Sequence, residues 1–257
     1  MITAGIDLGA KTTKVVVLRD GQVAARASVL TGFDQTEASE QALKRALQQA
    51  GQARGDVAKI FATGVGRQSA SQANGQLTEV AAAARGAQWL NPALRTVIDV
   101  GAEEGRAIKC TPDGKVADFA INEKCAAGAG SFIEAMSRAL ELPLESMGEM
   151  SLRSKTAVPM NAQCTVFAES EVVSLVHAKT PKEDIVRALH DAIANRIASM
   201  ALRVGVQEEV GLIGGIALNA GFVEALQRCL DVKSVWVPTE PEYVGAIGAA
   251  AAAAEAA

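Results

Sequence analysis

The sequence predicts an α/β fold made of two related halves. A strand that ends in an Asp-x-Gly turn opens the chain at Gly5-Ile-Asp-Leu-Gly9, and β-branched residues typical of further strands follow it. Val97-Ile-Asp-Val-Gly101 repeats this order about 90 residues later, again ahead of predicted strands. Apolar residues at helical spacing follow each set of strands. These observations place a boundary near residue 94.

The first half is expected to begin as a β-meander. Apolar residues predict a strand over 2–8, Val15-Val-Val17 predicts a second, and the Asp20-Gly21 hairpin signal predicts a third over 23–30. Helical spacing predicts a helix over 35–50. A strand over 57–63, a glycine turn and a helix near 77–90 complete this half.

The second half is expected to form strands over 106–109 and 116–121 and then to become helical. Its clearest helix begins at Thr180-Pro-Lys-Glu183, where the order of threonine, proline and glutamate is typical of a capping box. The alanine-rich segment 245–257 predicts a packed terminal helix that is too short and too weakly apolar to span a bilayer. One apolar stripe predicts which face of the long helix enters the core: Ile185, Leu189, Ile193, Ile197 and Val204.

The bulk properties exclude several classes of function. The net charge is −4 and the positive residues are dispersed among 257 residues, so neither nucleic acid nor a membrane surface is an expected partner. The N-terminus reaches Asp7 before any cleavable signal could develop, which predicts a cytoplasmic protein. Four scattered cysteines in a reducing compartment argue against a disulfide framework. Of these, Cys110 and Cys229 are expected to be structural.

Cys125 and Cys164 each lie in a segment rich in small residues, immediately before a predicted helix. The partial positive charge at a helix N-terminus favours a thiolate and tolerates a thiolate-ligated metal cluster. The pair therefore indicates metal chemistry. An iron–sulfur cluster normally needs four thiolates, so a second chain would supply the others and the cluster would lie on a dimer axis. The alternative is that both cysteines are buried and behave as small hydrophobes.

The segment from Asp7 to Lys14 could let backbone N–H groups approach phosphates. Gly9 permits a close turn, Asp7 can hold Mg²⁺ through water, and Lys11 or Lys14 can offset phosphate charge. The alternative is a plain hairpin, but the near-repeat at Asp99-Val-Gly101 favours a ligand site. The segment Val210-Gly-Leu-Ile-Gly-Gly-Ile-Ala217 has the form of a strand that runs into a helix, where an adenine or ribose could lie against the backbone.

The order of these three segments resembles that of the superfamily of acetate and sugar kinases, heat-shock chaperones and actin. Within it, Cys125-Ala-Ala-Gly-Ala-Gly-Ser-Phe132 and Cys164-Thr-Val-Phe-Ala-Glu-Ser-Glu-Val172 are similar to the ATPase family that contains the activators of 2-hydroxyacyl-CoA dehydratases and the ATPase subunits of benzoyl-CoA reductase. The resemblance covers essentially the whole chain. It implies a duplicated actin-like (ribonuclease H-like) α/β fold with two lobes around a nucleotide cleft. We expect 1–94 to form the first lobe, completed by a helix over 241–257, and 95–240 to form the second lobe with the cysteines.

The resemblance also implies a chemistry. Two identical or homologous subunits, a homodimer or a pseudo-symmetric dimer with a paralogue, would share one 4Fe-4S cluster. ATP turnover to ADP, with Mg²⁺, would drive one electron from ferredoxin or flavodoxin to acyl-CoA reductase or dehydratase subunits. Pushing an electron uphill by a few hundred millivolts needs several kcal/mol, which binding differences between nucleotide states can supply. ATP is expected to close the cleft and to move the helices after the two cysteines.

Site residues follow from the matching motifs. The resemblance implies that Cys125 and Cys164 are the cluster ligands and that Asp7, Asp99 and Glu103 serve catalysis. Thr63-Gly64-Val-Gly66-Arg67 belongs either to the neighbourhood of the cleft or to a strand-ending turn. The nucleotide contacts are expected from Gly9, Lys11, Thr12, Thr13, Lys14, Gly101, Ala102, Gly128, Gly130, Gly214, Gly215 and Ile216.

Two departures from the family pattern affect these expectations. Ala10 and Lys11 occupy places where hydroxyl residues are usual, so hydroxyl contacts must shift to Thr12 or Thr13. The second turn, usually Gly-Gly-Gln-Asp, is here Gly-Ala-Glu-Glu over 101–104, and a carboxylate near phosphate adds repulsion unless Mg²⁺ lies between them.

The choice of partner enzyme depends on other segments. Ala84-Arg-Gly-Ala87, Leu90-Asn-Pro92 and Gly105-Arg-Ala-Ile108 look more like benzoyl-CoA reductase subunits, whereas the cysteine segments are closer to dehydratase activators. The sequence therefore favours the reductase as the partner enzyme. A sugar or acetate kinase would need a general base, but His177 and His190 lie outside the motifs and are expected on a helix surface or in packing. A non-catalytic actin-like assembly module, which would contain no iron, is the remaining alternative.

Overall fold

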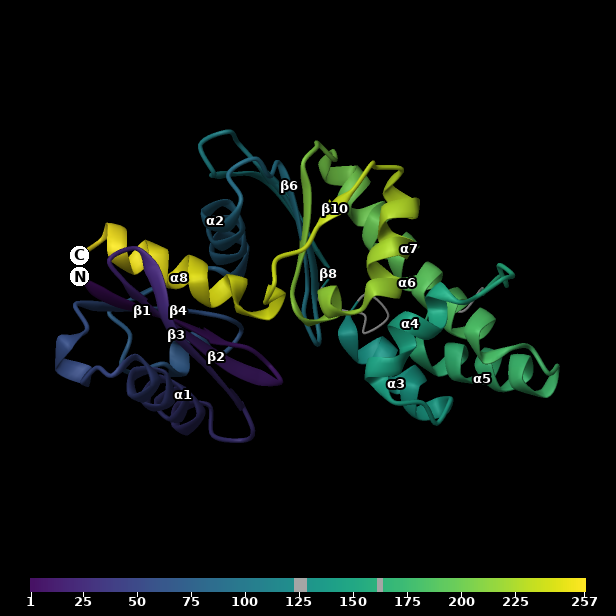
Figure 1. Cartoon of the computed structure of the whole chain (residues 1–257), viewed down its shortest axis with the longest axis horizontal. Coiled ribbons are helices and arrows are strands. Elements are labelled where there is room, and N and C mark those ends of the chain that lie inside the picture. Colours follow the sequence, from purple (N-terminus) through teal and green to yellow (C-terminus); the bar gives the residue numbers. More distant parts are fainter. Residues whose placement is uncertain (123–128, 161–163) are drawn as a thin grey trace. The chain divides into compact units, whose positions relative to one another are not determined.

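We describe the chain from a computed structural model that covers residues 1–122, 129–160 and 164–257. The chain divides into two compact units, and Figure 1 shows its helices and strands. Unit 1 comprises Met1–Leu94, Cys110–Ala117 and Glu242–Ala257. Unit 2 comprises Arg95–Lys109 and Asp118–Pro241. The C-terminal segment therefore belongs with the N-terminal part of the chain, and so does 110–117, which the predicted division assigns to the second lobe.

The sheet of unit 1 has the strand order β3-β2-β1-β4-β5. The first three strands form the predicted antiparallel meander, and β4 and β5 add to it in parallel. Alternating residues of β1 point to opposite faces, as a strand requires. The strands are β1 (Ile2–Leu8), β2 (Thr12–Arg19), β3 (Gln22–Leu30), β4 (Lys59–Thr63) and β5 (Gly75–Gln76).

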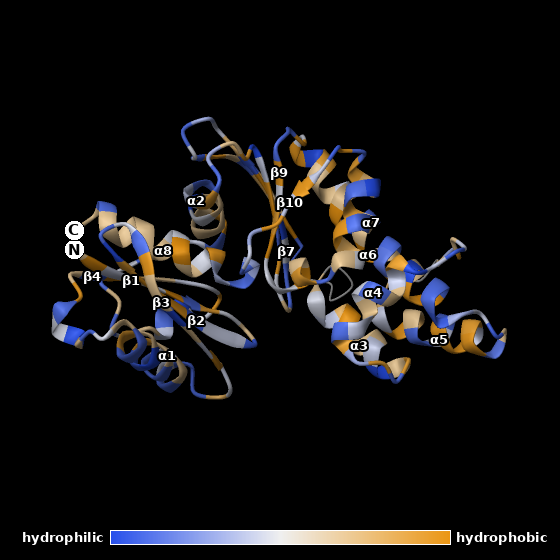
Figure 2. Cartoon of the chain, in the orientation of Figure 1, coloured by the Kyte–Doolittle hydropathy of each residue, from blue (hydrophilic) through white to orange (hydrophobic). Residues whose placement is uncertain are grey.

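One face of this sheet packs against α1 (Gln35–Ala50). Ile6 and Leu8 of β1 share a buried cluster with apolar residues of α1, and hydrophilic residues dominate the other side of that helix (Figure 2). The helix begins where the Asp34 carboxylate accepts a hydrogen bond from the Glu37 N–H. It ends at Gly51, whose φ of 64° is the left-handed conformation that glycine adopts without strain.

The opposite face packs against α8 (Val244–Glu255), which also crosses α2 (Glu79–Leu90). Glycines allow this close approach. A Cβ atom at Gly86 would clash with the Val244 carbonyl oxygen, and one at Gly248 would clash with that of Ala82. A Cβ atom at Gly5 of β1 would clash with the α8 backbone in the same way. The two helices and the strand therefore contact one another backbone to backbone.

The second sheet has the order β10-β9-β6-β7-β8 and repeats a feature of the first. In each sheet, the strand that leads into an Asp-x-Gly turn pairs antiparallel with the next strand and parallel with a later one. This relationship confirms the predicted duplication of the α/β pattern. The strands are β6 (Thr96–Val100), β7 (Gly105–Cys110), β8 (Val116–Asn122), β9 (Val210–Ile213) and β10 (Val235–Trp236).

The core of unit 2 is largely helical and centres on α6, in which every residue of the predicted apolar stripe is buried. Phe132, Met147 and Phe222 bring α3, α4 and α7 into the same core. Short 3₁₀ turns occur at 54–56, 67–69, 144–146, 215–218 and 241–243. The α-helices of this unit are α3 (Gly130–Ala139), α4 (Met147–Leu152), α5 (Thr165–His177), α6 (Lys182–Val204) and α7 (Ala220–Leu230).

The predicted capping box at the start of α6 is wrong. The helix begins at Lys182 after Pro181, which makes no side-chain cap. The buried Asp184 carboxylate instead accepts hydrogen bonds from the Ser154 hydroxyl at 2.7 Å and from the N–H groups of Lys155 and Thr156 at 3.0 and 3.1 Å. These bonds, led by the one from Ser154, lower the pKa of Asp184. The first turn of α6 thus holds the chain that leads toward Cys164.

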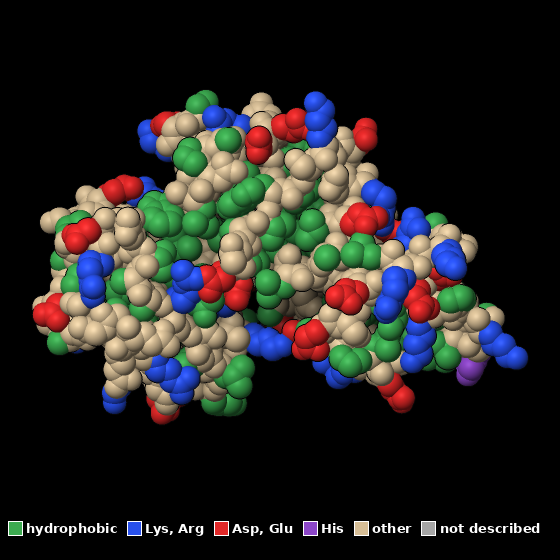
Figure 3. All heavy atoms as spheres, viewed as in Figure 1, with side chains coloured by type: hydrophobic (Ala, Val, Ile, Leu, Met, Phe, Trp, Pro, Cys, Tyr) green, Lys and Arg blue, Asp and Glu red, His purple; other side chains and the backbone are tan. Residues whose placement is uncertain are grey.

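The surface has mixed charge, and on the face shown in Figure 3 Lys and Arg residues are interspersed with Asp and Glu. Within the described ranges, no helix is both long and apolar enough to cross a membrane.

Candidate nucleotide and metal site

The first Asp-x-Gly turn joins β1 to β2 in unit 1. Asp7 and Lys14 are directly opposite each other in the antiparallel pair, so their side chains lie on the same face of the sheet. That face carries α8, and a Cβ atom at Gly245 would lie 3.1 Å from Asp7 Oδ2. The N-terminal turn of α8 therefore adjoins the Asp7 carboxylate, and the partial positive charge of a helix N-terminus interacts favourably with a carboxylate there.

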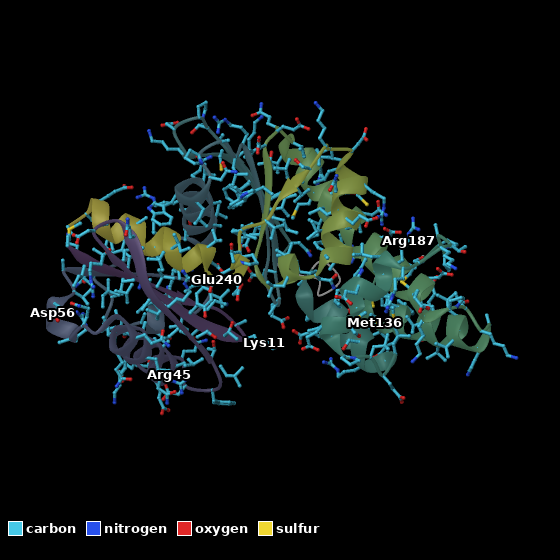
Figure 4. The ribbon with its side chains drawn as sticks, viewed as in Figure 1. Lys11, Arg45, Asp56, Met136, Arg187 and Glu240 are labelled. Carbon is cyan, nitrogen blue, oxygen red and sulfur yellow. The ribbon has the colours of Figure 1, made fainter. Side chains whose placement is uncertain are left out.

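The turn itself is tight. A Cβ atom at Gly9 would lie 2.9 Å from the Thr12 carbonyl oxygen. Lys11 is exposed at the end of the hairpin (Figure 4), and Thr12 is half-exposed. Thr13 is fully buried, with its hydroxyl 2.9 Å from that of Thr31. Of the two threonines predicted to supply a hydroxyl, Thr12 is therefore the one whose side chain reaches the surface.

The second Asp-x-Gly turn joins β6 to β7 in unit 2. Asp99 lies directly opposite Arg106 in the antiparallel pair. Arg106 is buried, donates from Nη1 to Asp99 Oδ2 at 3.0 Å, and donates from Nη2 to Glu104. The Gly101 N–H donates to the Glu104 carbonyl at 2.9 Å, which leaves Glu103 exposed at the tip of the turn. One buried cation thus compensates two of the three carboxylates.

The two turns share an arrangement of charge that the motif search missed. Asp7 and Lys14 in unit 1 correspond to Asp99 and Arg106 in unit 2. Each pair places a carboxylate and a positively charged side chain on facing residues of a hairpin. A signal was present in the sequence, because the spacing between acid and base is the same in both repeats. Thr31, the other residue missed, has no motif of its own.

The Gly-Gly segment follows β9 and lies beside the second turn. Gly214 has a φ of 86°, and a Cβ atom there would lie 2.8 Å from Asp99 Oδ1 and would clash with the Val100 carbonyl oxygen. Only glycine permits this approach. A Cβ atom at Gly215 meets no atom within 4 Å, and Ile216 is buried. The structure therefore brings Asp99 and Gly214 together and leaves open space at Gly215.

The start of α3 is attached to the second turn. The Gly130 N–H donates to the Gly101 carbonyl and the Ser131 N–H donates to the Ala102 carbonyl, each at 2.9 Å. The N–H group of Gly130 is therefore engaged within the protein. Gly128, like Cys125, lies outside the described residues. These hydrogen bonds connect the turn to the helix that follows the Cys125 segment.

Cys164 is the N-cap residue of α5 and is half-buried. This position matches the predicted helix N-terminus. Cys110 is buried in β7, and burial raises the pKa of the Cys229 thiol on α7. Among residues 1–122, 129–160 and 164–257, no three His, Cys, Asp or Glu side chains are grouped so that they could hold a metal ion. A cluster at Cys164 would thus need ligands from Cys125 and from outside this set.

The helix that begins after Cys164 exposes apolar residues. Val166 and Phe167 are 68% and 70% exposed, and Val173 and Val176 are also exposed. Ala168 and Val172 are the buried residues of this helix. Large apolar side chains beside a half-buried cysteine are typical of a surface that another protein covers.

The histidines lie where the sequence predicted, one on a helix surface and one in packing. His177 is exposed at the end of α5. His190 is fully buried, and Nε2 accepts from the Asn219 amide at 3.0 Å, because Asn219 Oδ1 already accepts from the Phe222 N–H. Burial, and then the charge of Arg228, lowers the pKa of His190 to about 3. A neutral, enclosed ring of this kind is a packing residue.

Comparisons with known proteins identify the fold and the family of the chain. The fold is that of the actin-like ATPases, as predicted. The pattern of the BadF/BadG/BcrA/BcrD ATPase family matches residues 4–253, and the chain belongs to this family. The chain is 37% identical to the activator of lactoyl-CoA dehydratase from Anaerotignum propionicum, over 100% of this chain and 99% of that one.

The chain is also similar to one solved structure and to one further protein sequence. The structure of the activator of the 2-hydroxyisocaproyl-CoA dehydratase from Clostridium difficile with bound ADPNP superposes with a TM-score of 0.94 at 36% identity, covering 100% of this chain and 95% of that one. A subunit of benzoyl-CoA reductase from Thauera aromatica is 33% identical, over 97% of this chain and 92% of that one.

Proposed function

We propose that this chain is an ATP-hydrolysing activator that delivers single electrons to an acyl-CoA enzyme, in the first place a 2-hydroxyacyl-CoA dehydratase. The observation that carries the proposal is the attachment of α3 to the second turn, through the bonds from Gly130 and Ser131. It joins a nucleotide-binding motif directly to a cysteine segment. Similarity to the lactoyl-CoA dehydratase activator over the whole chain supports the choice of partner.

The two aspartates are proposed to organise Mg²⁺ and the phosphates of ATP. Asp7 lies beside the α8 N-terminus, and Asp99 is fixed by Arg106 on one oxygen and adjoins Gly214 with the other. Carboxylates held in place can position Mg²⁺ through its water ligands. Because Glu104 is engaged by Arg106, the exposed Glu103 is the carboxylate of this turn proposed to orient the attacking water.

Cys125 and Cys164 are proposed to hold one 4Fe-4S cluster between two chains, which would take an electron from ferredoxin or flavodoxin and pass it to the partner enzyme. The half-buried N-cap position of Cys164 fits a shared ligand, because a thiolate there benefits from the helix N-terminus. The exposed Val166 and Phe167 beside it support burial against a second copy or a paralogue.

Coupling is proposed to run from the second turn into α3. If exchange of ATP for ADP shifts the carbonyls of Gly101 and Ala102, the N–H groups of Gly130 and Ser131 must follow or lose their partners. The helix start then moves with the turn. Losing a buried backbone hydrogen bond costs on the order of 1 kcal/mol, so following the turn is the cheaper outcome.

The second candidate is the ATPase subunit of benzoyl-CoA reductase, which the segments at 84–92 and 105–108 favour. Packing accounts for one residue of these segments, because Gly86 permits the close crossing of α2 and α8. Arg106 instead acts within the second turn. The 33% identity with the reductase protein and the 37% identity with the lactoyl-CoA dehydratase activator are close in value, so the partner is best decided by chemistry.

ATP stoichiometry tests this choice. Dehydration needs an electron only to start each catalytic run, because the electron is recovered, whereas ring reduction consumes electrons in every turnover. The chain would be combined with a 2-hydroxyacyl-CoA dehydratase or with the remaining benzoyl-CoA reductase subunits, and ATP hydrolysis would be measured per product. ATP use far below product formation with the dehydratase supports the proposal. Activity only with the reductase, at ATP use that tracks product, overturns it.

A further inference from the structure

Thr31 makes several contacts with the first Asp-x-Gly turn, although β2 and β3 separate the two in the sequence. Its hydroxyl donates to the Gly9 carbonyl at 2.7 Å and lies 2.9 Å from the Thr13 hydroxyl. Its N–H donates to the Lys11 carbonyl at 3.0 Å. Thr31 is buried, and so is Thr13. A single residue thus holds the turn at two carbonyls and one side chain.

These contacts set the direction of two peptide units. In a trans peptide the C=O and N–H groups point in opposite directions. The Gly9 carbonyl is directed at Thr31, so the Ala10 N–H of the same peptide points away from Thr31. The Lys11 carbonyl is also directed at Thr31, so the Thr12 N–H points away as well. The N–H groups of Ala10 and Thr12, two residues apart, are thus both directed away from Thr31, and backbone N–H groups at such a turn can bind phosphate oxygens.

Backbone N–H groups aimed in this way could also compensate for the hydroxyl side chains that are missing from this turn. Ala10 and Lys11 replace the hydroxyl residues usual in this turn, and the Thr13 hydroxyl is engaged with Thr31. Backbone N–H groups need no particular side chain. They can therefore bind phosphate where the hydroxyls are missing, provided that the turn is held in a fixed orientation.

We infer that Thr31 is a positioning residue of the nucleotide site, which aims the N–H groups of Ala10 and Thr12 at a phosphate of the nucleotide. The inference rests on the proposed function, because it takes the turn to be a phosphate site. Its contribution is specific to the phosphates, since Thr31 acts only on the turn. Adenosine binding should not depend on it.

The test compares two substitutions in the full chain by calorimetry with Mg-ADP and by competition with adenosine. Thr31→Val keeps the side-chain shape and removes the hydroxyl, and it is expected to weaken Mg-ADP binding about tenfold, the effect of losing one or two hydrogen bonds. Adenosine affinity should stay within about twofold. Thr31→Ser keeps the hydroxyl and is expected to restore Mg-ADP binding to within about twofold of the original chain.

Thr3 supplies a matched control. It is a buried threonine of the same sheet, and its hydroxyl donates to the Ala250 carbonyl at 3.1 Å, outside the turn. Thr3→Val should leave Mg-ADP binding unchanged. If Thr31→Val does not fold, Thr13→Val removes the hydroxyl that contacts Thr31 and should show a smaller loss of the same kind, for Mg-ADP and not for adenosine, because the Thr31 hydroxyl keeps its bond to the Gly9 carbonyl.

The outcomes separate this inference from the function on which it rests. If the unsubstituted chain binds neither Mg-ADP nor Mg-ATP, the proposed function fails. If it binds Mg-ADP and Thr31→Val binds equally well, or loses adenosine to the same degree, the role of Thr31 is overturned alone. If Thr31→Ser does not retain Mg-ADP binding, the role of the Thr31 hydroxyl is likewise overturned.

Discussion

The guanidinium of Arg106 and the carboxylate of Asp99 form a buried ion pair, with Nη1 3.0 Å from Oδ2. The same guanidinium also donates to Glu104. Removing the cation leaves two carboxylates uncompensated inside the protein. Arg106→Met is therefore expected to lower the free energy of unfolding by about 3 kcal/mol, measured by urea unfolding.

Lys115 provides the comparison for this prediction. Its pair with Asp113 is exposed, with side chains that are 81% and 60% accessible. Exposed pairs contribute little, so Lys115→Met should leave the free energy of unfolding nearly unchanged. Equal losses in the two variants would show that the Asp99 pair is not stabilising beyond an ordinary surface contact.

Asp7→Asn is expected to keep the fold and to lower ATP hydrolysis by about a hundredfold, because an amide cannot hold Mg²⁺ as a carboxylate does. Asp99→Asn should behave similarly. Phosphate release with Mg-ATP measures both. Asp20→Asn is the control, since Asp20 is exposed and its φ of 51° suits asparagine equally well. Normal Mg²⁺-dependent hydrolysis in both Asn variants would move the site elsewhere.

Iron content tests the shared cluster. After anaerobic purification, the chain is expected to contain about two iron atoms per polypeptide, by the four-thiolate rule applied across a dimer. Cys125→Ser and Cys164→Ser should each abolish the brown colour and the iron. Cys110→Ser and Cys229→Ser should retain both. Four irons per chain, or iron lost with Cys110, would mean that a single chain encloses the cluster.

His190 predicts a dependence of stability on pH. Its pKa is about 3 in the folded chain, against about 6.5 when unfolded. Between these values the unfolded state binds the extra proton, so stability decreases as the pH falls. The contribution is at most about 1.4 kcal/mol per pH unit below pH 6.5, and urea unfolding from about pH 7 to about pH 5 measures it.

Substitution separates this histidine from other titrating groups. His190→Gln should reduce the loss of stability between neutral and mildly acidic pH. His177→Gln should not, because His177 is exposed on α5. An unchanged pH dependence in His190→Gln would mean that groups other than His190 account for it.

Periodicity and repetition predicted the meander, the duplicated strand order and the buried stripe of α6, because these depend on local residue patterns. The start of α6 was predicted wrongly from an equally local signal. The helix begins one residue later than the capping pattern predicts, and its first turn takes part in a tertiary contact, in which Asp184 accepts hydrogen bonds from the backbone of residues 155 and 156. A local pattern cannot predict such a contact, because its partners lie far apart in the sequence.

In the candidate site, too, local motifs could be predicted from the sequence and tertiary contacts could not. The acidic turns and the Gly-Gly segment were predictable as motifs, but the residues that hold them were not. Thr31 reaches Gly9 across a sheet, and Gly130 reaches Gly101 across a boundary between a strand and a helix. Such contacts become visible only when strand register is known. The carboxylate and the cation that face each other in each hairpin could have been predicted from the sequence. Aligning the two strands around each turn places Asp7 opposite Lys14 and Asp99 opposite Arg106.

The position of α8 affects how the protein folds during its synthesis on the ribosome. Val16 and Leu18 of the first hairpin are buried by Ala246, Ile247, Ala250 and Ala251, residues that are translated after all of unit 2. Unit 2 is synthesised in full before this helix exists. Because domains generally fold as units during synthesis, the sheet of unit 1 has one face uncovered until α8 has been made. The sheet is thus synthesised before unit 2, and its packing is completed after unit 2.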